Sequence, residues 1–318
     1  MMIEKVGGVR PIPDPVKRYG LIVIGKGPAG VQAAIYAARA KIPVAIFGFD
    51  EGSLKLAQKI ENFYSVQGSI SGLDLHKIGV EQAKRFGVEQ INSVVVGLGY
   101  SDDGGYYVAT PDSKYECSAL LLATGSQREK APVEGVEGFL GRGVSYCAVC
   151  DGFFFSGKKV GVLGYTDYTA HEAMELRNIT EDVIVFLNGR DGEFSPLSRA
   201  FFVDKGVRII ESPIEKILGE EKLTGVQLSD GTEEALDGLF VAYGIASSSD
   251  LAQKLGIVLS ENGDIVTDIG QKTNIPGVFA AGDCTGAFRQ VSIAVGQGAM
   301  AAKSIIEYLS DRDKHTIR

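Results

Sequence analysis

The feature that most constrains the fold of this chain is an apolar segment that leads into a glycine-rich loop and then a helix. Tyr19–Gly25 is a short apolar run, typical of a strand buried in a parallel sheet. It is followed by Gly25-Lys26-Gly27-Pro28-Ala29-Gly30, an alanine-rich helical stretch at Val31–Ala40 and a second strand at Val44–Phe47. Glycines at this spacing allow the turn, the approach of backbone to a pyrophosphate and close helix–strand packing. We therefore expect a βαβ unit that binds a dinucleotide at the helix N-terminus.

A second series of strands and helices occupies the middle of the chain. The pattern predicts strands at Lys159–Gly164 and Val183–Leu187, with a helix at Asp167–Arg177 between them. Further predicted elements are a helix at Ser198–Lys205 and strands at Val207–Ile210, Gly225–Leu228 and Leu239–Tyr243. The 318 residues are enough for two domains. We expect an α/β protein with two Rossmann-like, doubly wound domains: residues 1–125 and 247–318 form a discontinuous one, and residues 126–246 are inserted into it.

The composition excludes several classes of function. The net charge of −8, without any Lys/Arg-rich run, argues against a nucleic-acid-binding protein. The polar, proline-rich start lacks the apolar core of a signal peptide, and no apolar run approaches the ~20 residues of a membrane helix. We expect a cytoplasmic protein that acts without a membrane.

Cys147 and Cys150 are separated by two residues, and Asp151 follows at once. In a reducing compartment such a pair is usually redox-active or metal-bound. The other cysteines and the histidines stand singly in the sequence, at Cys117, Cys284, His76, His171 and His315. Because they form no cluster, no metal site is expected. The spacing predicts a redox-active dithiol, with a purely stabilising disulfide as the alternative. Cys117 and Cys284 are expected to be reduced bystanders.

Two other stretches favour FAD as the dinucleotide. The predicted strand Leu120–Thr124 ends in the tight turn Ala123-Thr124-Gly125-Ser126, suited to a crossover between domains. The predicted strand Gly277–Asp283 presents an acid directly after Gly282, and a helix is expected at Ser292–Leu309. We expect the positive end of this helix to face the same ligand.

These motifs, in this order, resemble the low-molecular-weight thioredoxin reductases over essentially the whole chain. The matching segments, besides the glycine loop, are Ile60-Glu61-Asn62-Phe63, Ala123-Thr124-Gly125, Cys147-Ala148-Val149-Cys150-Asp151-Gly152, Ala281-Gly282-Asp283 and Arg289-Gln290. The resemblance implies a homodimer that reduces thioredoxin or a thioredoxin-like protein. It implies that Cys150 faces the flavin, that Cys147 attacks the partner disulfide and that Asp151 exchanges protons. It also implies FAD binding by Gly25, Gly27, Pro28, Ala29, Gly30, Asn62, Ala123, Thr124, Gly125, Gly282, Asp283, Arg289 and Gln290.

The inserted segment departs from the NADPH-using members of that family. Where they carry Gly-Gly-Gly-Asp/Asn-Ser/Thr-Ala, this chain has Gly164-Tyr165-Thr166-Asp167-Tyr168-Thr169, and Leu187-Asn188-Gly189 replaces His-Arg-Arg. Side chains at Tyr165 and Thr166 stand where backbone would touch a pyrophosphate, and neither residue readily takes a positive φ. Thr169 in place of Ala is expected to loosen the contact of helix and strand. Each lost charged contact to the 2′-phosphate removes roughly 1.5–3 kcal/mol, so NADPH is not an expected cofactor.

The departure itself resembles the ferredoxin-dependent flavin thioredoxin reductases, with Glu51-Gly52-Ser53-Leu54 as a shortened flavin segment. This implies reduced ferredoxin or flavodoxin as the electron donor, and Lys55 and Lys59 are candidate docking residues if their segment is helical. A second flavin stacked on Tyr165 or Tyr168 is a further possibility. The alternatives are an NAD(P)H-dependent thioredoxin reductase with a divergent site and a redox-sensing or electron-carrier flavoprotein without catalysis. Ferredoxin–NADP reductases of similar build lack the cysteine pair.

Overall fold

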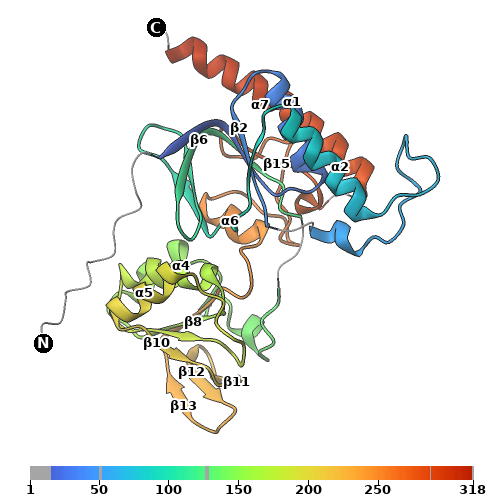
Figure 1. Cartoon of the computed structure of the whole chain (residues 1–318). Helices are drawn as coiled ribbons and strands as arrows, with labels where there is room; N and C mark the ends of the chain where they lie inside the picture. Colours follow the sequence, from blue (N-terminus) through green and yellow to red (C-terminus); the bar gives the residue numbers. More distant parts are fainter. Residues whose placement is uncertain (1–15, 50–51, 126–128, 287, 317–318) are drawn as a thin grey trace, which may run out of the picture. The chain divides into compact units, whose positions relative to one another are not determined.

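A computed structural model describes residues 16–49, 52–125, 129–286 and 288–316 (Figure 1). The chain divides into two compact units. The terminal unit comprises Lys17–Val108, Tyr115–Gln127 and Ser247–Arg318, and the inserted unit comprises Ala109–Lys114 and Arg128–Ala246. The predicted domain border at Ser126 lies outside the described residues, as do Glu51 of the predicted flavin segment and most of the N-terminal stretch.

The terminal unit contains, among the described residues, a seven-stranded sheet with the order β3-β2-β1-β6-β5-β4, in which β15 also pairs with β6. Strands β1, β2, β3, β6 and β15 run parallel to their partners in this set. The apolar side chains of β1, β2, β6 and β15 are buried on both faces, which explains the continuous apolar runs in the sequence. The strands are β1 (Lys17–Ile24), β2 (Val44–Phe47), β3 (Glu89–Ile91), β4 (Gly97–Tyr100), β5 (Tyr106–Ala109), β6 (Lys114–Leu122) and β15 (Val278–Ala280).

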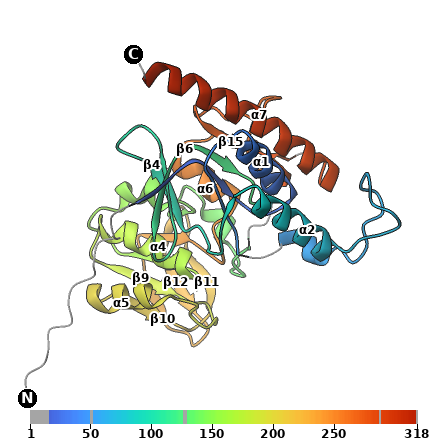
Figure 2. The same cartoon turned by 45° about the horizontal axis from the view of Figure 1, so that its top comes forward.

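The helices of this unit cover the sheet with small residues. Helix α1 (Pro28–Arg39) lies along α7 (Val291–Thr316), as Figures 1 and 2 both show. The two helices can approach closely because Gly298 has no Cβ. An added Cβ there would lie only 2.3 Å from the carbonyl oxygen of Ala29. Helix α2 (Gly72–Arg85) contacts the same α1, and α6 (Ser248–Lys254) contacts β4.

The inserted unit contains, within the described residues, a five-stranded parallel sheet with the order β10-β9-β8-β14-β7 and a three-stranded antiparallel sheet, β11-β12-β13. Helices α4 (Asp167–Arg177) and α5 (Pro196–Lys205) contact each other. Its strands are β7 (Val144–Ser145), β8 (Val160–Leu163), β9 (Val183–Phe186), β10 (Arg208–Ile210), β11 (Ile214–Gly219), β12 (Leu223–Leu228), β13 (Glu233–Ala235) and β14 (Gly238–Val241).

The predicted α/β class with parallel, Rossmann-like sheets is confirmed. The predicted bounds of β2 and α4 coincide with the observed ones, and α1 begins three residues earlier than predicted because Pro28 and the two residues after it already belong to its first turn. In the part of the chain that the structure describes, no helix is long and apolar enough to cross a membrane.

Candidate functional site

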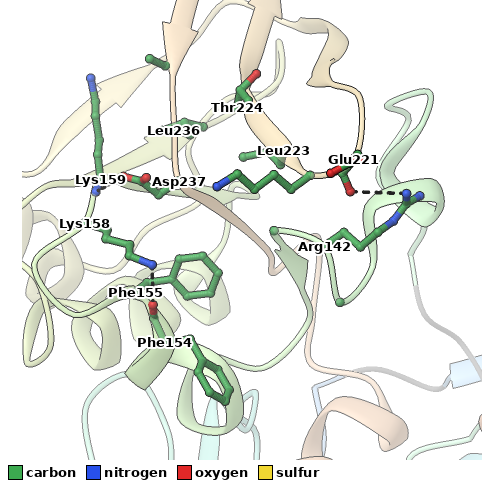
Figure 3. A pocket seen from close by; sticks show the side chains of 14 residues that line it. Arg142, Phe154, Phe155, Lys158, Lys159, Glu221, Leu223, Thr224, Leu236 and Asp237 are labelled. Carbon is green, nitrogen blue, oxygen red and sulfur yellow. Dashed lines mark hydrogen bonds between the residues drawn. The ribbon is translucent and has the colours of Figure 1, made fainter.

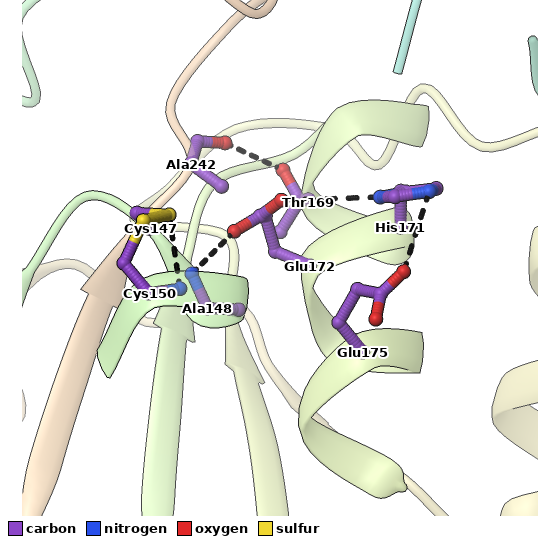
Figure 4. A network of polar contacts seen from close by, with 8 residues as sticks. All are labelled: Cys147, Ala148, Cys150, Thr169, His171, Glu172, Glu175 and Ala242. Atoms are coloured by element: carbon purple, nitrogen blue, oxygen red, sulfur yellow. Dashed lines mark hydrogen bonds and ion pairs between the residues drawn. A yellow bond between two sulfur atoms is a disulfide. The ribbon is translucent and has the colours of Figure 1, made fainter. Parts of the chain in front are cut away.

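The cysteine pair lies where the chain leaves β7 and turns into the short helix α3 (Ala148–Asp151). Cys147 and Cys150 form a disulfide, with Cα atoms 5.3 Å apart (Figure 4). The backbone N–H of Cys150 donates to Cys147 Sγ at 3.1 Å, so Cys147 caps the helix that carries its partner. The local turn therefore holds the two sulfur atoms together.

The carboxylate of Asp151 is linked to the first cysteine by a single hydroxyl group. Ser145 Oγ donates to Asp151 Oδ2 at 2.6 Å and accepts from the backbone N–H of Cys147 at 3.0 Å. Asp151 is the last residue of α3 and the N-cap residue of the following 3₁₀ helix Gly152–Phe155, but its side chain makes no capping hydrogen bond there. The sequence analysis missed Ser145, because no motif marks a serine two residues before the first cysteine.

A second acid, Glu172 of α4, contacts the same turn at Ala148 (Figure 4). Its side chain is 1% exposed, and its Oε2 accepts the backbone N–H of Ala148 at 2.9 Å. The sequence analysis missed this residue too. The sequence feature that could have identified Glu172 is its place on the same helix face as Thr169, Ala173 and Leu176, where a charged residue is unusual because this face is buried.

The two sulfur-bearing residues differ in exposure. Cys147 is 2% exposed, whereas Cys150 is exposed together with Val149, Phe153 and Phe154. Large exposed apolar side chains that gather on one surface are typical of protein–protein interaction sites. The disulfide thus lies beside an apolar surface that is suited to another protein, with Cys150 as its exposed member and Cys147 as its buried one.

A cavity of about 640 Å³ adjoins Phe154 in the inserted unit (Figure 3). Two cationic side chains that line it donate hydrogen bonds to backbone carbonyl groups. Lys158 Nζ donates to the carbonyl of Phe154 at 3.0 Å, and Arg142 donates to the carbonyl of Glu221 at 3.4 Å. The positive charges therefore fix the segment next to α3 as well as lining the cavity.

The remaining cysteines are free and buried. Burial raises the pKa of the Cys117 and Cys284 thiols to about 12, so both stay protonated at neutral pH. The prediction that these two residues are reduced bystanders agrees with the structure.

The glycine loop between β1 and α1 shows a separate role for each glycine. Gly25 has φ +114, and a Cβ on it would lie 2.1 Å from the carbonyl oxygen of Ala123. A Cβ on Gly30 would lie 2.0 Å from the carbonyl oxygen of Gly25, whereas a Cβ on Gly27 would meet nothing within 4 Å. Gly25 and Gly30 are thus required by packing inside the protein, and Gly27 leaves open space where the N-terminus of α1 begins. Such a loop fits the pyrophosphate of a dinucleotide.

The predicted turn and acid motifs lie at the same edge of the sheet as this loop. Strand β15 pairs with β6 so that Ala280 is opposite Leu122, and the backbone N–H of Ala123 donates to Ile24 at 2.8 Å. The carboxyl ends of β1, β6 and β15 therefore adjoin, which is where ligands bind in open α/β sheets. Of the described residues, Thr124 is one whose buried hydroxyl oxygen has no hydrogen-bond partner. A polar ligand at this edge would satisfy it.

Gly282 and Asp283 follow β15 directly. Gly282 has φ +88, and a Cβ there would lie 3.0 Å from the Cβ of Ala29, so this turn is placed beside the N-terminus of α1. Its backbone N–H donates to Gln297 of α7 at 2.8 Å. Asp283 thus begins the short 3₁₀ helix Asp283–Thr285 next to the open glycine loop, as a residue that contacts a bound dinucleotide would.

The two predicted flavin-side residues Asn62 and Gln290 are in contact although they are 228 residues apart, since Asn62 Nδ2 donates to Gln290 Oε1 at 3.0 Å. Arg289 is exposed beside this pair. The condition set for Lys55 and Lys59 as docking residues, that their segment is helical, is met by Lys55 but not by Lys59. The 3₁₀ helix Gly52–Leu56 ends before Lys59, which forms an ion pair with Glu61 at 2.8 Å.

The predicted nucleotide loop of the inserted unit is closed by its own side chains. Only Gly164 of the loop has a positive φ, at +156. Thr169 is fully buried: its Oγ1 donates to the carbonyl of Ala242 at 2.8 Å and accepts the N–H of Thr166 at 3.2 Å. The hydroxyl group of Thr169 thus caps α4 and ties this helix to the residue after β14, a bond that opposes the loosening expected from the sequence.

Tyr165 occupies the same loop with a buried side chain that is 5% exposed. Its hydroxyl donates to Glu129 Oε2 at 2.9 Å and accepts from Arg190 at 3.1 Å, and the Arg190 guanidinium lies 4.3 Å from the ring centroid. Burial, together with Glu129, raises the pKa of Tyr165 to about 12. The Glu129 carboxylate also lies within 2.5 Å of where a Cβ on Gly244 would be. Glu129 also forms an ion pair with Arg190, whose guanidinium lies 4.0 Å from its Oε1, so the acid and the cation of this loop are engaged with each other.

The segment that replaces His-Arg-Arg is also turned inward. Leu187 is 4% exposed, and Asn188 is 9% exposed with φ 55. Asn188 Oδ1 accepts the backbone N–H of Ile214 at 2.7 Å, and Gly189 has φ +76. These three uncharged residues follow β9, and Asn188 joins them to the first residue of β11.

Comparison with known proteins gives one consistent picture. The family model described as pyridine nucleotide-disulphide oxidoreductase matches residues 19–298. The chain is 35% identical to a thioredoxin reductase of Aquifex aeolicus, over 95% of this chain and 96% of that protein. Among solved structures, an atypical thioredoxin reductase, TRi, from Desulfovibrio vulgaris Hildenborough is 38% identical with a TM-score of 0.88, over 92% of this chain and 98% of that one. A ferredoxin-flavin thioredoxin reductase from Clostridium acetobutylicum is 31% identical with a TM-score of 0.67, over 93% and 100%.

Proposed function

Because the chain belongs to the pyridine nucleotide-disulphide oxidoreductase family, we propose that it is a thioredoxin reductase that uses FAD and the Cys147–Cys150 dithiol. The observation that carries this proposal is a disulfide beside exposed apolar residues and two carboxylates. A disulfide kept only for stability would need neither an exposed apolar surface nor an acid linked to its first cysteine. The same features speak against a carrier or sensor that does no chemistry on another protein.

FAD is proposed to lie on the terminal unit, across the open loop at Gly27 and the N-terminus of α1. Gly25, Pro28, Ala29 and Gly30 shape this loop. The other proposed contacts are Asn62, Ala123, Thr124, Gly125, Gly282, Asp283, Arg289 and Gln290, of which Thr124 offers its unsatisfied hydroxyl group. When bound, FAD supplies the electrons that reduce the disulfide.

The residues of the inserted unit then perform thiol–disulfide exchange. A thiolate must attack the disulfide of the protein substrate, and the leaving sulfur must be protonated. Cys147 is proposed as the attacking thiol and Cys150 as the one that resolves the mixed disulfide. Asp151, whose carboxylate accepts a hydrogen bond from Ser145, is proposed to accept and return the proton. Phe153 and Phe154 provide the apolar contact for the substrate protein.

Reduced ferredoxin or flavodoxin is proposed as the electron donor instead of NADPH. The support is the loop at Tyr165, where a nucleotide would bind. The Tyr165 side chain occupies this space together with the charged side chains of Glu129 and Arg190. The alternative, NAD(P)H bound through other contacts, predicts that this cluster moves aside. A second flavin stacked on Tyr165 is disfavoured, because Arg190 covers the ring and Tyr243 packs against its edge.

A homodimer in the cytoplasm is proposed from the resemblance to this family alone. Size-exclusion chromatography with light scattering tests the oligomeric state. A monomer at micromolar concentration would contradict it.

The experiment that tests the enzyme is insulin reduction coupled to thioredoxin, run without oxygen and with the donor varied between reduced ferredoxin, NADPH and NADH. Cys147→Ser and Cys150→Ser are expected to abolish turnover while FAD stays bound. Cys117→Ser is the matched control, because that buried thiol stays protonated, and should retain activity. Turnover in either serine variant of the pair would refute the dithiol mechanism.

A further inference from the structure

The buried acid Glu172 is not explained by the proposed exchange reaction, in which Asp151 carries the proton. Glu172 is 1% exposed, and its carboxylate accepts the N–H of Ala148, the residue directly after Cys147 (Figure 4). Moving a carboxylate out of water costs several kcal/mol unless hydrogen bonds or opposite charges compensate. A nonpolar residue would fill the same space on α4 without this cost, so the carboxylate calls for a reason.

Glu172 lies close to the ring of His171 and is hydrogen-bonded to the dithiol turn. Nδ1 of His171 is 3.8 Å from Glu172 Oε1, and Glu175 lies 3.8 Å from the other ring nitrogen. His171 is therefore shared between two acids and lies beyond hydrogen-bonding distance of each. The short contact of Glu172 is to the turn that carries Cys147.

The dithiol turn cannot move away from Glu172 without repacking. A Cβ on Gly152, directly after Asp151, would lie 2.7 Å from Ile179 Cδ1 and 3.3 Å from Leu176 Cδ2. Helix α3 therefore rests directly on α4 and on the residues that follow it. In the disulfide state the carboxylate is one hydrogen bond from the residue after Cys147.

We propose that Glu172 is a positioning residue of the dithiol centre, whose buried carboxylate holds the turn at Ala148 and opposes negative charge on the neighbouring thiol. The inference rests on the proposed redox role of Cys147 and Cys150. Reduction of their disulfide breaks one S–S bond and takes up two electrons and two protons, which gives two thiols. Loss of one proton then gives the attacking thiolate. A nearby negative charge disfavours that ionisation, so Glu172 keeps the reduced centre protonated until Asp151 takes the proton.

The test is the pH profile of thiol alkylation in the FAD-loaded full chain. Dithiothreitol reduces the disulfide and is itself oxidised to its cyclic disulfide. After its removal, iodoacetamide labels the thiols, and mass spectrometry identifies the labelled residue. Cys117 and Cys284 contribute little, because burial raises the pKa of both thiols to about 12.

Glu172→Gln keeps the side-chain size and can still accept from Ala148, but it removes the charge. We expect it to lower the apparent pKa of the more reactive thiol by about one unit, which is roughly a tenfold larger thiolate fraction below that pKa. Glu172→Asp keeps the charge and should shift the profile less than Glu172→Gln. Glu175→Gln is the matched control on the same helix: its carboxylate is 33% exposed, and its profile should equal that of the wild type.

Glu172→Met removes the charge with an apolar side chain of similar length and replaces the Gln variant if that variant does not fold. Flavin absorbance and thermal unfolding establish which variants are folded. A folded, charge-free variant with the wild-type profile would overturn the proposal. This readout needs neither thioredoxin nor an electron donor. An unchanged profile in an enzyme that still reduces thioredoxin therefore refutes the role of Glu172 alone, and a wild type that cannot reduce thioredoxin refutes the proposed function.

Discussion

The glycine loop allows a sharp prediction, because its glycines are required for different physical reasons. Gly27→Ala adds a methyl group where nothing lies within 4 Å, at an N-cap with φ −70 that any residue adopts. Gly25→Ala adds the same group at φ +114, and 2.1 Å from the carbonyl oxygen of Ala123. The first change affects a bound ligand, whereas the second affects the fold itself.

The magnitudes follow from these positions. For Gly27→Ala the loss of folding free energy is limited to the weaker N-cap, about 0.5–1 kcal/mol. For Gly25→Ala the strained φ adds about 1–3 kcal/mol, and the displaced Ala123 carbonyl adds about 1–3 kcal/mol more. The affinity for FAD should show the opposite pattern, because the added methyl group of Gly27→Ala lies where the pyrophosphate is proposed to bind. We expect FAD binding to weaken at least about tenfold, or roughly 1.4 kcal/mol.

The assay compares the apoproteins first and the loaded proteins second. Urea unfolding of the apoproteins should place Gly27→Ala close to the wild type and Gly25→Ala far below it. Fluorescence titration with FAD should then show weak binding by Gly27→Ala despite its intact fold. Wild-type affinity in Gly27→Ala would refute the reasoning, because the open space at this glycine would then not be the cofactor site.

Two further predictions concern the inserted unit. Thr169→Val removes a buried hydroxyl group that bonds the carbonyl of Ala242, and it should lower the free energy of unfolding by about 1–3 kcal/mol; a urea midpoint equal to that of the wild type would contradict the capping role. Phe154→Ala truncates a side chain that is 67% exposed, so it should leave the thermal midpoint nearly unchanged and raise the KM for thioredoxin several-fold at constant kcat. An unchanged KM would place the substrate surface elsewhere, with Val203, which is 84% exposed on α5, as the matched position for a control truncation.

Much of the fold was predictable from local pattern, because strands buried on both faces must be continuously apolar. This holds for the strands β1, β2 and β8. The helix α4 was also predicted, and its predicted ends coincide with the observed ones. The short strands β3, β4 and β5 and the helix α2 were not predicted. The strands among them are only three or four residues long, too short for a periodic signal.

The site was predictable where a motif carried it and not where distant segments meet. The cysteine pair and the glycine loop have fixed spacings, so their residues were identified in the sequence. Ser145, Glu129 and Glu172 act through contacts with residues that are distant or that belong to another element. Thr169 shows the opposite limit: the substitution was noticed in the sequence, but the two hydrogen bonds of its hydroxyl group, which cap α4 and join it to Ala242, were not predicted.

The most direct test of the central claim is the visible absorbance of the flavin after anaerobic mixing of the FAD-loaded protein with an electron donor. Excess NADPH and then NADH are added first, and reduced ferredoxin afterwards. We expect no bleaching with either nucleotide, rapid bleaching with ferredoxin, and reduction of added thioredoxin that requires Cys147 and Cys150. Rapid bleaching by NADPH or NADH would contradict the account, because it would mean that the loop closed by Tyr165, Glu129 and Arg190 still admits a nucleotide.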